Sequence, residues 1–494
     1  MSSQALDHLA LLPAYAAAAT VIAVLLTELV VARAAAVFAS AGVGIVVTAA
    51  AAIATPSGIE TLCLDDGCSY ATSTPAALIV VTLCGLTLAV LAMSVPPLRA
   101  RDTVAPASEY VFLLTCALTG GVVLAYARDI VTIVVALETL TLPLYVLVSM
   151  TGRIGTGDTA APRERVSAEV SVSFLLVSVA ASAVTLLGAA LLYTATGYLH
   201  LAGWRDTLGA SVEPVSAVGV VLVIAGVAFK LAAVPLHGWA PGTYDGAPLP
   251  IAAYLSTASK LGGVVALTWV VTYGFANITV VAGFALAVLS VASMTVGNLV
   301  ALRQRRAVRL LAWSSVAQAG YVLVPLAVFA SVDATDSLVA SARAATLGFA
   351  VFYVVIEIGA FSAVTALRPN GADGGRIEDF AGTFRYRPWA AGCLVLALIG
   401  LAGLPPGLAG LFAKITIMAP AAVSAPWLAV VVVVNAVIGL VYYLRFAVVT
   451  VRRSRGAQLA PSSRWTAVTA VTVAIVAVVL GFAPQLVLGL AAAS

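Results

Sequence analysis

The chain has 494 residues, of which 62% are hydrophobic and 9% are charged, and its formal net charge is +4. A mean hydropathy of +1.09 excludes a water-soluble globular domain, in which about a quarter of the residues are charged. No hydrophilic stretch is long enough for a soluble catalytic domain, and the positive charge comes from short loops, so nucleic-acid binding is not indicated.

Apolar runs recur from end to end, each with the roughly 20 residues that a helix needs to cross a bilayer. Their continuity favours helices over a β-barrel, whose strands would show short alternating segments. We therefore expect an all-α polytopic membrane protein of about fourteen transmembrane helices. The runs lie near residues 9–32, 34–54, 75–97, 109–127, 130–150, 167–195, 213–236, 248–273, 276–301, 307–330, 337–366, 389–419, 427–450 and 465–490.

The loops between these runs alternate between arginine-rich and arginine-poor. The first arginine, Arg33, follows the first span, so we expect no cleavable signal peptide. By the positive-inside rule the arginine-rich loops face the cytoplasm, and an even number of spans then places both termini outside the inner membrane. The arginine-rich set comprises Arg33, Arg99, Arg101, Arg153, Arg163, Arg165, Arg303, Arg305, Arg306, Arg368, Arg376, Arg385, Arg387, Arg452, Arg453, Arg455 and Arg464.

The cysteines do not form a metal-binding ladder. Cys63 and Cys68 share one outer loop, where an oxidising compartment allows a disulfide; a pair of free thiols is the alternative. Cys84, Cys116 and Cys393 stand alone in apolar spans and are typical of small core side chains. With three histidines and no CxxC ladder, the sequence predicts no metal site on this chain.

The chain has only three lysines, Lys230, Lys260 and Lys414, and all of them lie inside apolar stretches. A charged residue at hydrocarbon depth is costly and by default marks an ion or proton pathway. Lysine can give up its proton when desolvated, whereas arginine stays charged. Glu138, in the fifth span, is the natural partner of Lys230, and the pair either switches a proton or simply pins two helices together.

Other polar residues suggest how a proton would travel further. Lys260 ends the polar run STASK, whose hydroxyls either hold a water chain or pack helices together. His237, just after Pro235, is either a relay between Lys230 and Lys260 or an interfacial residue.

Three later features complete the polar pattern. Glu357 is a second intramembrane carboxylate, and we expect it to pair with Lys414 or an arginine. Lys414 is a relay candidate, with snorkelling to an interface as the alternative. Tyr442 and Tyr443, beside Arg445, are typical of interfacial anchors.

Two spans carry prolines that interrupt a helix. The seventh has Lys230 before Pro235, and the twelfth has Pro405 and Pro406 before Lys414. Interrupted spans at corresponding places point to a transport site between inverted repeats, here of five helices each. The predicted divisions are 1–104 (three N-terminal helices), 105–273 (first repeat), 274–451 (second, inverted repeat) and 452–494 (C-terminal helix).

Several segments together resemble one known family. They are ALETLTLPLYVLVS, FKLAAVPLHGWAPGTYDGAPLPIAAYLSTASKLGGVVAL, RRAVRLLAWSSVAQAGYVLV, LAGLPPGLAGLFAK and NAVIGLVYYLRFAVV, in this order across residues 105–450. They resemble the antiporter-like, proton-translocating subunits of respiratory complex I (NADH-quinone oxidoreductase), most of all its subunit N. Related chains occur in Mrp-type cation/proton antiporters and membrane-bound hydrogenases.

The resemblance implies fourteen helices, two inverted five-helix repeats and a central polar axis. It implies that Glu138 and Lys230 form the key pair, and that Lys260, Lys414 and His237 are further relay positions. It also implies that FMN, iron–sulfur clusters and quinone belong to partner subunits, which include neighbouring antiporter-like subunits, and that this chain holds no cofactor.

This chain departs from the family pattern in its titratable residues. Ser173 aligns where relatives carry a lysine in the sixth span, and Gln318 replaces a histidine of the tenth. Val308-Arg309 stands where relatives have Lys-Arg. These replacements leave fewer titratable residues along the proton path that the resemblance implies.

The sequence thus favours a proton-translocating subunit of NADH-quinone oxidoreductase, with Glu138, Lys230, Lys260 and Lys414 as its relay and His237 and Glu357 as additional candidates. One alternative is a subunit of a Mrp-type antiporter exchanging Na⁺ or K⁺ for protons, or of a membrane-bound hydrogenase. A second is a structural subunit whose polar axis is vestigial.

Overall fold

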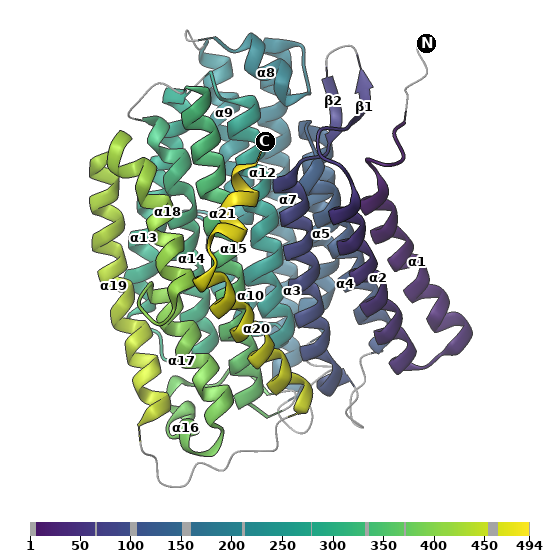
Figure 1. The fold of residues 1–494 in the computed structure, drawn as a ribbon, viewed down its shortest axis with the longest axis vertical. Coiled ribbons are helices and arrows are strands. Elements are labelled where there is room, and N and C mark those ends of the chain that lie inside the picture. The colour runs from purple at the N-terminus through teal and green to yellow at the C-terminus, as the bar shows by residue number, and fades with distance from the viewer. Residues whose placement is uncertain are drawn as a thin grey trace.

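The chain folds into a bundle of long helices that run side by side (Figure 1). Backbone groups in lipid must satisfy one another, and helices do so within a single segment. The computed structural model describes residues 6–64, 67–98, 106–150, 160–209, 213–277, 279–330, 335–369, 372–452 and 463–493.

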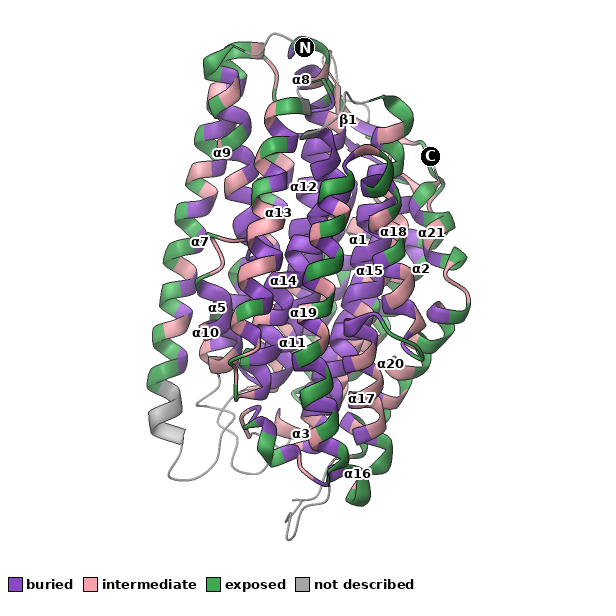
Figure 2. Cartoon of the chain, turned by 90° about the vertical axis from the view of Figure 1, so that its left-hand side faces the viewer, coloured by how far each residue is buried: buried purple, intermediate pink, exposed green. Residues whose placement is uncertain are grey.

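Helices α1 (Leu12–Val31) and α2 (Ala34–Ala54) form one edge of the bundle, and α3 (Thr74–Leu98) lies further in, packed on α2, α4 and α20. Few residues of α1 are buried, whereas the eighth predicted span is buried throughout (Figure 2 shows the burial of the bundle from a second side). The N-terminal edge therefore presents an apolar surface, and the interior of the bundle lies in the later helices.

A two-stranded hairpin joins α2 to α3, which the sequence analysis did not foresee. Strand β1 (Glu60–Leu64) pairs antiparallel with β2 (Gly67–Ala71), and Cys63 lies opposite Cys68. These two cysteines form a disulfide, so of the two alternatives for this loop the bonded one is found.

The remaining helices follow in two successive groups. The first contains α4 (Ala107–Tyr126), α5 (Ile130–Ser149), α7 (Ala160–Thr196), α8 (Leu201–Thr207), α9 (Pro214–Lys230), α10 (Trp239–Gly246), α11 (Leu249–Tyr254), a π-helical turn (Leu255–Ser259), α12 (Lys260–Trp269) and a second π-helical turn (Val270–Gly274). The second contains α13 (Thr279–Ala301), α14 (Ala307–Ala327), α15 (Asp336–Leu367), α16 (Thr383–Tyr386), α17 (Pro388–Ala402), α18 (Leu408–Ser424) and α19 (Pro426–Val451), with 3₁₀ turns at Val328–Ala330 and Ile377–Phe380. Helices α20 (Arg464–Phe482) and α21 (Gln485–Ala492) close the chain.

The seventh and twelfth spans are interrupted, as the prolines predict. Helix α9 ends at Lys230 and α10 begins only at Trp239, while α17 ends at Ala402 and α18 begins at Leu408. Proline lacks the N–H that a continuing helix needs, so the backbone leaves the helix in both segments. In the described part of the chain, twelve helices are long and apolar enough to span a membrane, and these two broken spans complete the fourteen predicted.

The all-α membrane fold is thus confirmed, with the hairpin as an addition. Helix α4 packs on α5 as α13 packs on α14, and α7 packs on α9 as α15 packs on α17 and α18. This parallel order of packing agrees with two repeats. Their inverted relation, and the divisions at 105–273 and 274–451, stay a prediction.

The two ends of the bundle carry different loops. The hairpin and α8 lie at the upper end of Figure 1, while α16, which carries Arg385, lies at the lower end. For these described elements the predicted separation of loops is a separation in space, whereas Arg99, Arg101, Arg153, Arg453 and Arg455 lie outside the described residues.

Glycines allow the backbones of α13 and α14 to approach closely. A Cβ atom added to Gly297 would lie 2.5 Å from the backbone nitrogen of Ala317, and one added to Gly320 would lie 2.5 Å from that of Met294. Small residues at such contacts are the usual basis of helix packing in membranes.

Gly320→Ala should therefore destabilise the fold by about 1–3 kcal/mol, because the added methyl forces two backbones apart. Thermal unfolding of the chain in mild detergent measures this effect. Gly392→Ala is the matched control, since nothing lies within 4 Å of a Cβ atom there. Equal midpoints for the two variants would contradict the packing described.

Candidate functional site

Lys230 is the last residue of α9, where the broken seventh span leaves the helix. Its Nζ atom lies 2.8 Å from Oε1 of Glu138 and also donates to Ser178 Oγ at 2.8 Å and Thr141 Oγ1 at 3.1 Å. An ammonium group has three donors, and all three are used. The ion pair expected from the sequence is therefore present, and two hydroxyl groups also accept hydrogen bonds from its ammonium group.

Helix α7 lines this pair with one polar face. Ser182 donates to Oε1 of Glu138, and Tyr145 donates to Ser178 at 2.6 Å. Ser178 is buried and Ser182 is four residues, one helical turn, further along.

The sequence alignment placed Ser173 where relatives carry a lysine. In the structure Ser173 is exposed on the outer side of α7, while Ser171 and Phe174 beside it are buried. Because residues on one helix face recur every three to four positions, Ser178 and Ser182 occupy the face toward Lys230 and Ser173 does not. Ser173 therefore does not take part in the contacts of Lys230, and its correspondence to a lysine of the relatives stays a prediction.

Lys260 is 2% exposed and begins α12, directly after the π-helical turn Leu255–Ser259. Its Nζ atom donates to both the carbonyl and the hydroxyl of Ser315 on α14, at 2.7 and 2.5 Å. Tyr353 on α15 donates to the same hydroxyl at 2.9 Å. Single π-helical turns inside α-helices are frequent at functional sites. We call Lys260 with Ser256, Ser315, Tyr353 and Glu357 the Lys260 centre.

Glu357 belongs to this centre rather than to Lys414 or an arginine, which corrects the expected pairing. Its Oε1 atom accepts from Ser256 at 2.8 Å, and Ser256 in turn lies 3.3 Å from the Ser315 hydroxyl that binds Lys260. Glu357 is fully buried, and its Oε2 atom has no hydrogen-bond partner among the described residues. A buried carboxylate oxygen without a partner is costly and leaves a place for a proton or a water molecule.

Lys414 on α18 is buried and turns toward the break in its own span. Its Nζ atom donates at 2.5 Å to the carbonyl of Ala402, the last residue of α17, and lies 5.6 Å from the ring centre of Tyr321. The last carbonyls of a helix have no intrahelical partner and form the negative end of its dipole. The lysine thus satisfies the broken helix and does not snorkel to an interface.

Polar side chains connect the Lys260 centre with the region of Lys414. Tyr443 bonds Ser314, the neighbour of Ser315, at 2.5 Å, and Gln318 donates to Tyr443 at 3.2 Å. Gln318 thus contributes a neutral polar group to this region.

A second link runs through Tyr442 to Asn298 at 2.9 Å and on to Tyr321 at 3.3 Å. Tyr442 and Tyr443 are buried, so they are part of the axis and not interfacial anchors.

His237 lies in the irregular segment between α9 and α10. Its ring centre is 5.1 Å from that of Trp313, and its Nδ1 atom is buried without a hydrogen-bond partner in the described part of the chain. None of the hydrogen bonds made by Lys230 or Lys260 goes to this ring. A relay role would need water between the groups.

Metal-ligating residues do not gather elsewhere. Within the described residues, no group of three or more histidine, cysteine, aspartate or glutamate side chains could hold a metal ion.

Comparison with known proteins places the whole axis inside one family. The family model described as NADH:quinone oxidoreductase/Mrp antiporter, TM, matches residues 127–439, more than half of the chain. The chain belongs to this family. The matched segment contains all of the relay candidates, from Glu138 to Lys414.

Individual relatives agree with the family. The chain is 50% identical to the NADH-quinone oxidoreductase subunit N of Salinispora tropica, over 99% of each chain. It is 44% identical to the NADH-quinone oxidoreductase subunit N 2 of Streptomyces griseus, over 79% of this chain and 75% of that relative.

Solved structures of the family superpose over almost the full length. A chain of respiratory complex I from Thermus thermophilus with bound aureothin matches with a TM-score of 0.79 and 28% identity, covering 98% of this chain and 100% of that chain. A chain of the Mrp complex from Dietzia sp. DQ12-45-1b matches with a TM-score of 0.83, covering 99% and 97%, but its 20% identity shows the fold alone.

Removing a hydroxyl that binds Lys230 should be costly, since Ser178→Ala leaves a buried ammonium donor unpaired. We expect a loss of about 1.5–3 kcal/mol in stability, measured as a lower thermal midpoint in detergent. Ser173→Ala, on the exposed side of the same helix, is the control and should change stability by less than about 0.5 kcal/mol. If the two variants behaved alike, α7 would not present the face described.

Proposed function

We propose that this chain is the proton-translocating subunit N of a type I NADH-quinone oxidoreductase. The observation that carries the proposal is the row of three buried lysines, each held by a different set of hydroxyl, carboxylate or carbonyl oxygens. The names of the relatives that cover most of the chain support it. Buried ionisable residues within membrane spans are rare and mark proton pathways by default.

In the proposed mechanism the Glu138–Lys230 pair acts as a switch. While Glu138 lies against Lys230, the carboxylate favours the charged ammonium form, and if the carboxylate moves away, burial favours the neutral amine and a proton leaves. The hydroxyls of Ser178 and Thr141 contact the same Nζ atom and would accept the proton first.

The proton would next reach the Lys260 centre and leave by way of Lys414. Glu357 has one oxygen free to hold a proton near Lys260, and His237 is an additional relay through water. Gln318 donates to Tyr443 between the regions of the two lysines, and these two neutral side chains would orient the polar groups there.

The energy would come from other subunits. We propose that FMN, iron–sulfur clusters and quinone are bound by partner subunits, and that this chain contacts membrane neighbours of its own kind as well as peripheral subunits. We place it in the inner membrane, with the arginine-rich end in the cytoplasm and both termini outside, on the strength of the loop arginines.

Lys230→Ala in the intact complex should abolish or strongly reduce the share of proton pumping due to this chain, while the complex still assembles. Lys230→Arg should do the same, because arginine keeps the charge but does not release its proton. The number of protons moved per electron, measured with a pH-sensitive dye in inverted membrane vesicles, gives the result. A normal ratio in both variants would refute the proposed role and favour a vestigial axis.

A cation/proton antiporter is the alternative that the same vesicles can test. The proposal predicts that an imposed Na⁺ or K⁺ gradient drives no proton exchange without NADH. Exchange that persists without NADH, and that Lys230→Ala removes, would assign the chain to the antiporter branch of its family.

A further inference from the structure

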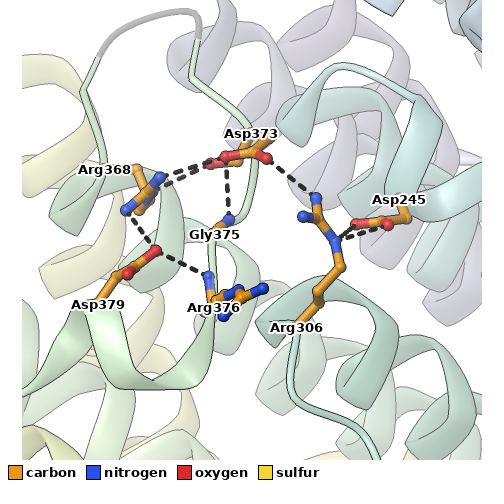
Figure 3. A network of polar contacts seen from close by, with 7 residues as sticks. All are labelled: Asp245, Arg306, Arg368, Asp373, Gly375, Arg376 and Asp379. Atoms are coloured by element: carbon orange, nitrogen blue, oxygen red, sulfur yellow. Dashed lines mark hydrogen bonds and ion pairs between the residues drawn. The ribbon is translucent and has the colours of Figure 1, made fainter.

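A charged cluster lies at the arginine-rich end of the bundle, outside the row of lysines (Figure 3). At its centre, Nε of Arg306 donates to both carboxylate oxygens of Asp245, at 2.9 and 2.8 Å, and Nη2 donates to Asp373 at 3.0 Å. Asp373 also accepts from Arg368 at 3.2 Å, and Arg368 donates to Asp379 at 3.3 Å. We call Arg306, Asp245 and Asp373 the Arg306 latch.

The latch joins the ends of three helices. Asp245 lies on α10, Arg306 immediately precedes α14, and Asp373 follows α15. Two of these helices line the Lys260 centre, since α14 supplies Ser315 and α15 supplies Glu357. A movement of these helix ends would therefore also move residues that line the Lys260 centre.

Helix α10 is the shortest of the three helices, and it packs on α7 and α14 as well as being held by the latch. It has only eight residues and follows the irregular segment of the broken seventh span, so it lacks a continuous helix to hold it. Tyr244, the neighbour of Asp245, is fully buried and donates to the carbonyl of Leu255 at 3.2 Å. Leu255 opens the π-helical turn that carries Ser256 and ends just before Lys260.

The segment that precedes α14 and the segment that follows α15 are also joined by backbone hydrogen bonds that do not involve the Arg306 side chain. The backbone of Ala307 donates to the carbonyl of Gly375 at 3.0 Å, and that of Ile377 donates to the carbonyl of Arg305 at 2.8 Å. The Arg306 guanidinium consequently adds one specific connection, which is the connection to α10.

A pocket of 520 Å³ lies beside the latch. Its lining includes all three latch residues together with Glu169, Tyr110 and Thr365. A shift of α10 relative to α14 and α15 would change the access of water to this pocket, so the pocket offers a direct readout of the latch.

We propose that Arg306 is a positioning residue for proton transfer at the Lys260 centre, acting by holding α10 against α14 and α15. The expected effect on proton pumping rests on the proposed function, whereas the contacts of the latch do not depend on it. With the latch closed, Tyr244 keeps the π-helical turn in place and Lys260 within hydrogen-bond distance of Ser315. With the latch open, α10 separates and the relay loses its alignment.

The ion pairs of the Arg306 latch are partly exposed, so the latch can open and close reversibly. The side chains of Arg306, Asp245 and Asp373 are 35%, 18% and 30% exposed, so water competes with each ion pair. Ion pairs of this kind contribute modestly and can break and re-form, in contrast to the fully buried contacts of Lys260.

The test uses the whole complex in inverted vesicles with a reporter thiol, Thr365→Cys, on the pocket wall. In this background Arg306→Gln should speed labelling by a membrane-impermeant maleimide about fivefold, the usual effect of one ion pair on a local opening equilibrium. It should also lower the number of protons moved per electron while quinone reduction continues. Arg306→Lys should give labelling and pumping values between those of the Thr365→Cys background and those of Arg306→Gln. Lysine keeps the positive charge but lacks the planar guanidinium that binds both oxygens of Asp245.

Arg303→Gln is the matched control, since Arg303 lies in the same loop, is exposed and makes no ion pair in the described structure. It should leave labelling and pumping unchanged, and labelling without Thr365→Cys gives the background of the native cysteines. If Arg306→Gln and Arg303→Gln were indistinguishable, the inference would be overturned. If Arg306→Gln fails to assemble, Asp245→Asn decides, because it removes the charge that binds Arg306 on α10, and unchanged labelling would count against the latch.

The experiment separates this inference from the proposed function. Faster labelling in Arg306→Gln together with normal pumping would show that the latch exists but does not position the relay, which overturns the inference alone. Normal pumping in Lys230→Ala would instead refute the proposed function, whatever Arg306→Gln does.

Discussion

The cost of placing a charge in hydrocarbon governs this structure more than any other constraint. Each of the three lysines meets that cost in a different way. Lys230 has a carboxylate and two hydroxyls, Lys260 has one serine that offers both its carbonyl and its hydroxyl, and Lys414 has the open end of a helix. The three ammonium groups are thus held by different kinds of oxygen atom.

The irregular backbone follows from the same constraint. A continuous helix uses all its carbonyls internally, whereas a broken one leaves several free to bind a cation. The break after Ala402 supplies the oxygen that binds Lys414, and the break after Lys230 frees α10 to be held by side chains instead of by a helix. The two helix breaks thus affect both how the bundle packs and how its buried lysines are held.

The sequence predicted those features that have strong one-dimensional signals. Apolar runs and prolines located the spans and the two interruptions, and the rarity of lysine singled out the axis. Glu138 and Lys230 were paired because few other charges were available at that depth. Neutral polar residues were harder, since Ser178 and Tyr443 look like packing or interfacial residues until their neighbours are known.

Other features depend on information that only the folded chain contains. Ser173 lies on the exposed side of α7 and Ser178 on the side that faces Lys230, a difference that only the folded helix reveals. The partner of Glu357 depends on how α15 meets the π-helical turn, which no local pattern reveals. The hairpin between α2 and α3 was hidden because its two strands are only five residues long.

One simple property of the chain has a practical side. All three of its lysines are buried, at 5%, 2% and 9% exposure, and every other cationic side chain except histidine is arginine. The folded surface therefore offers amine-directed reagents no lysine side chain. Reagents that act on lysine side chains would therefore label exposed lysines of other proteins but not those of this chain, and reagents for carboxylates or guanidinium groups would reach its side chains instead.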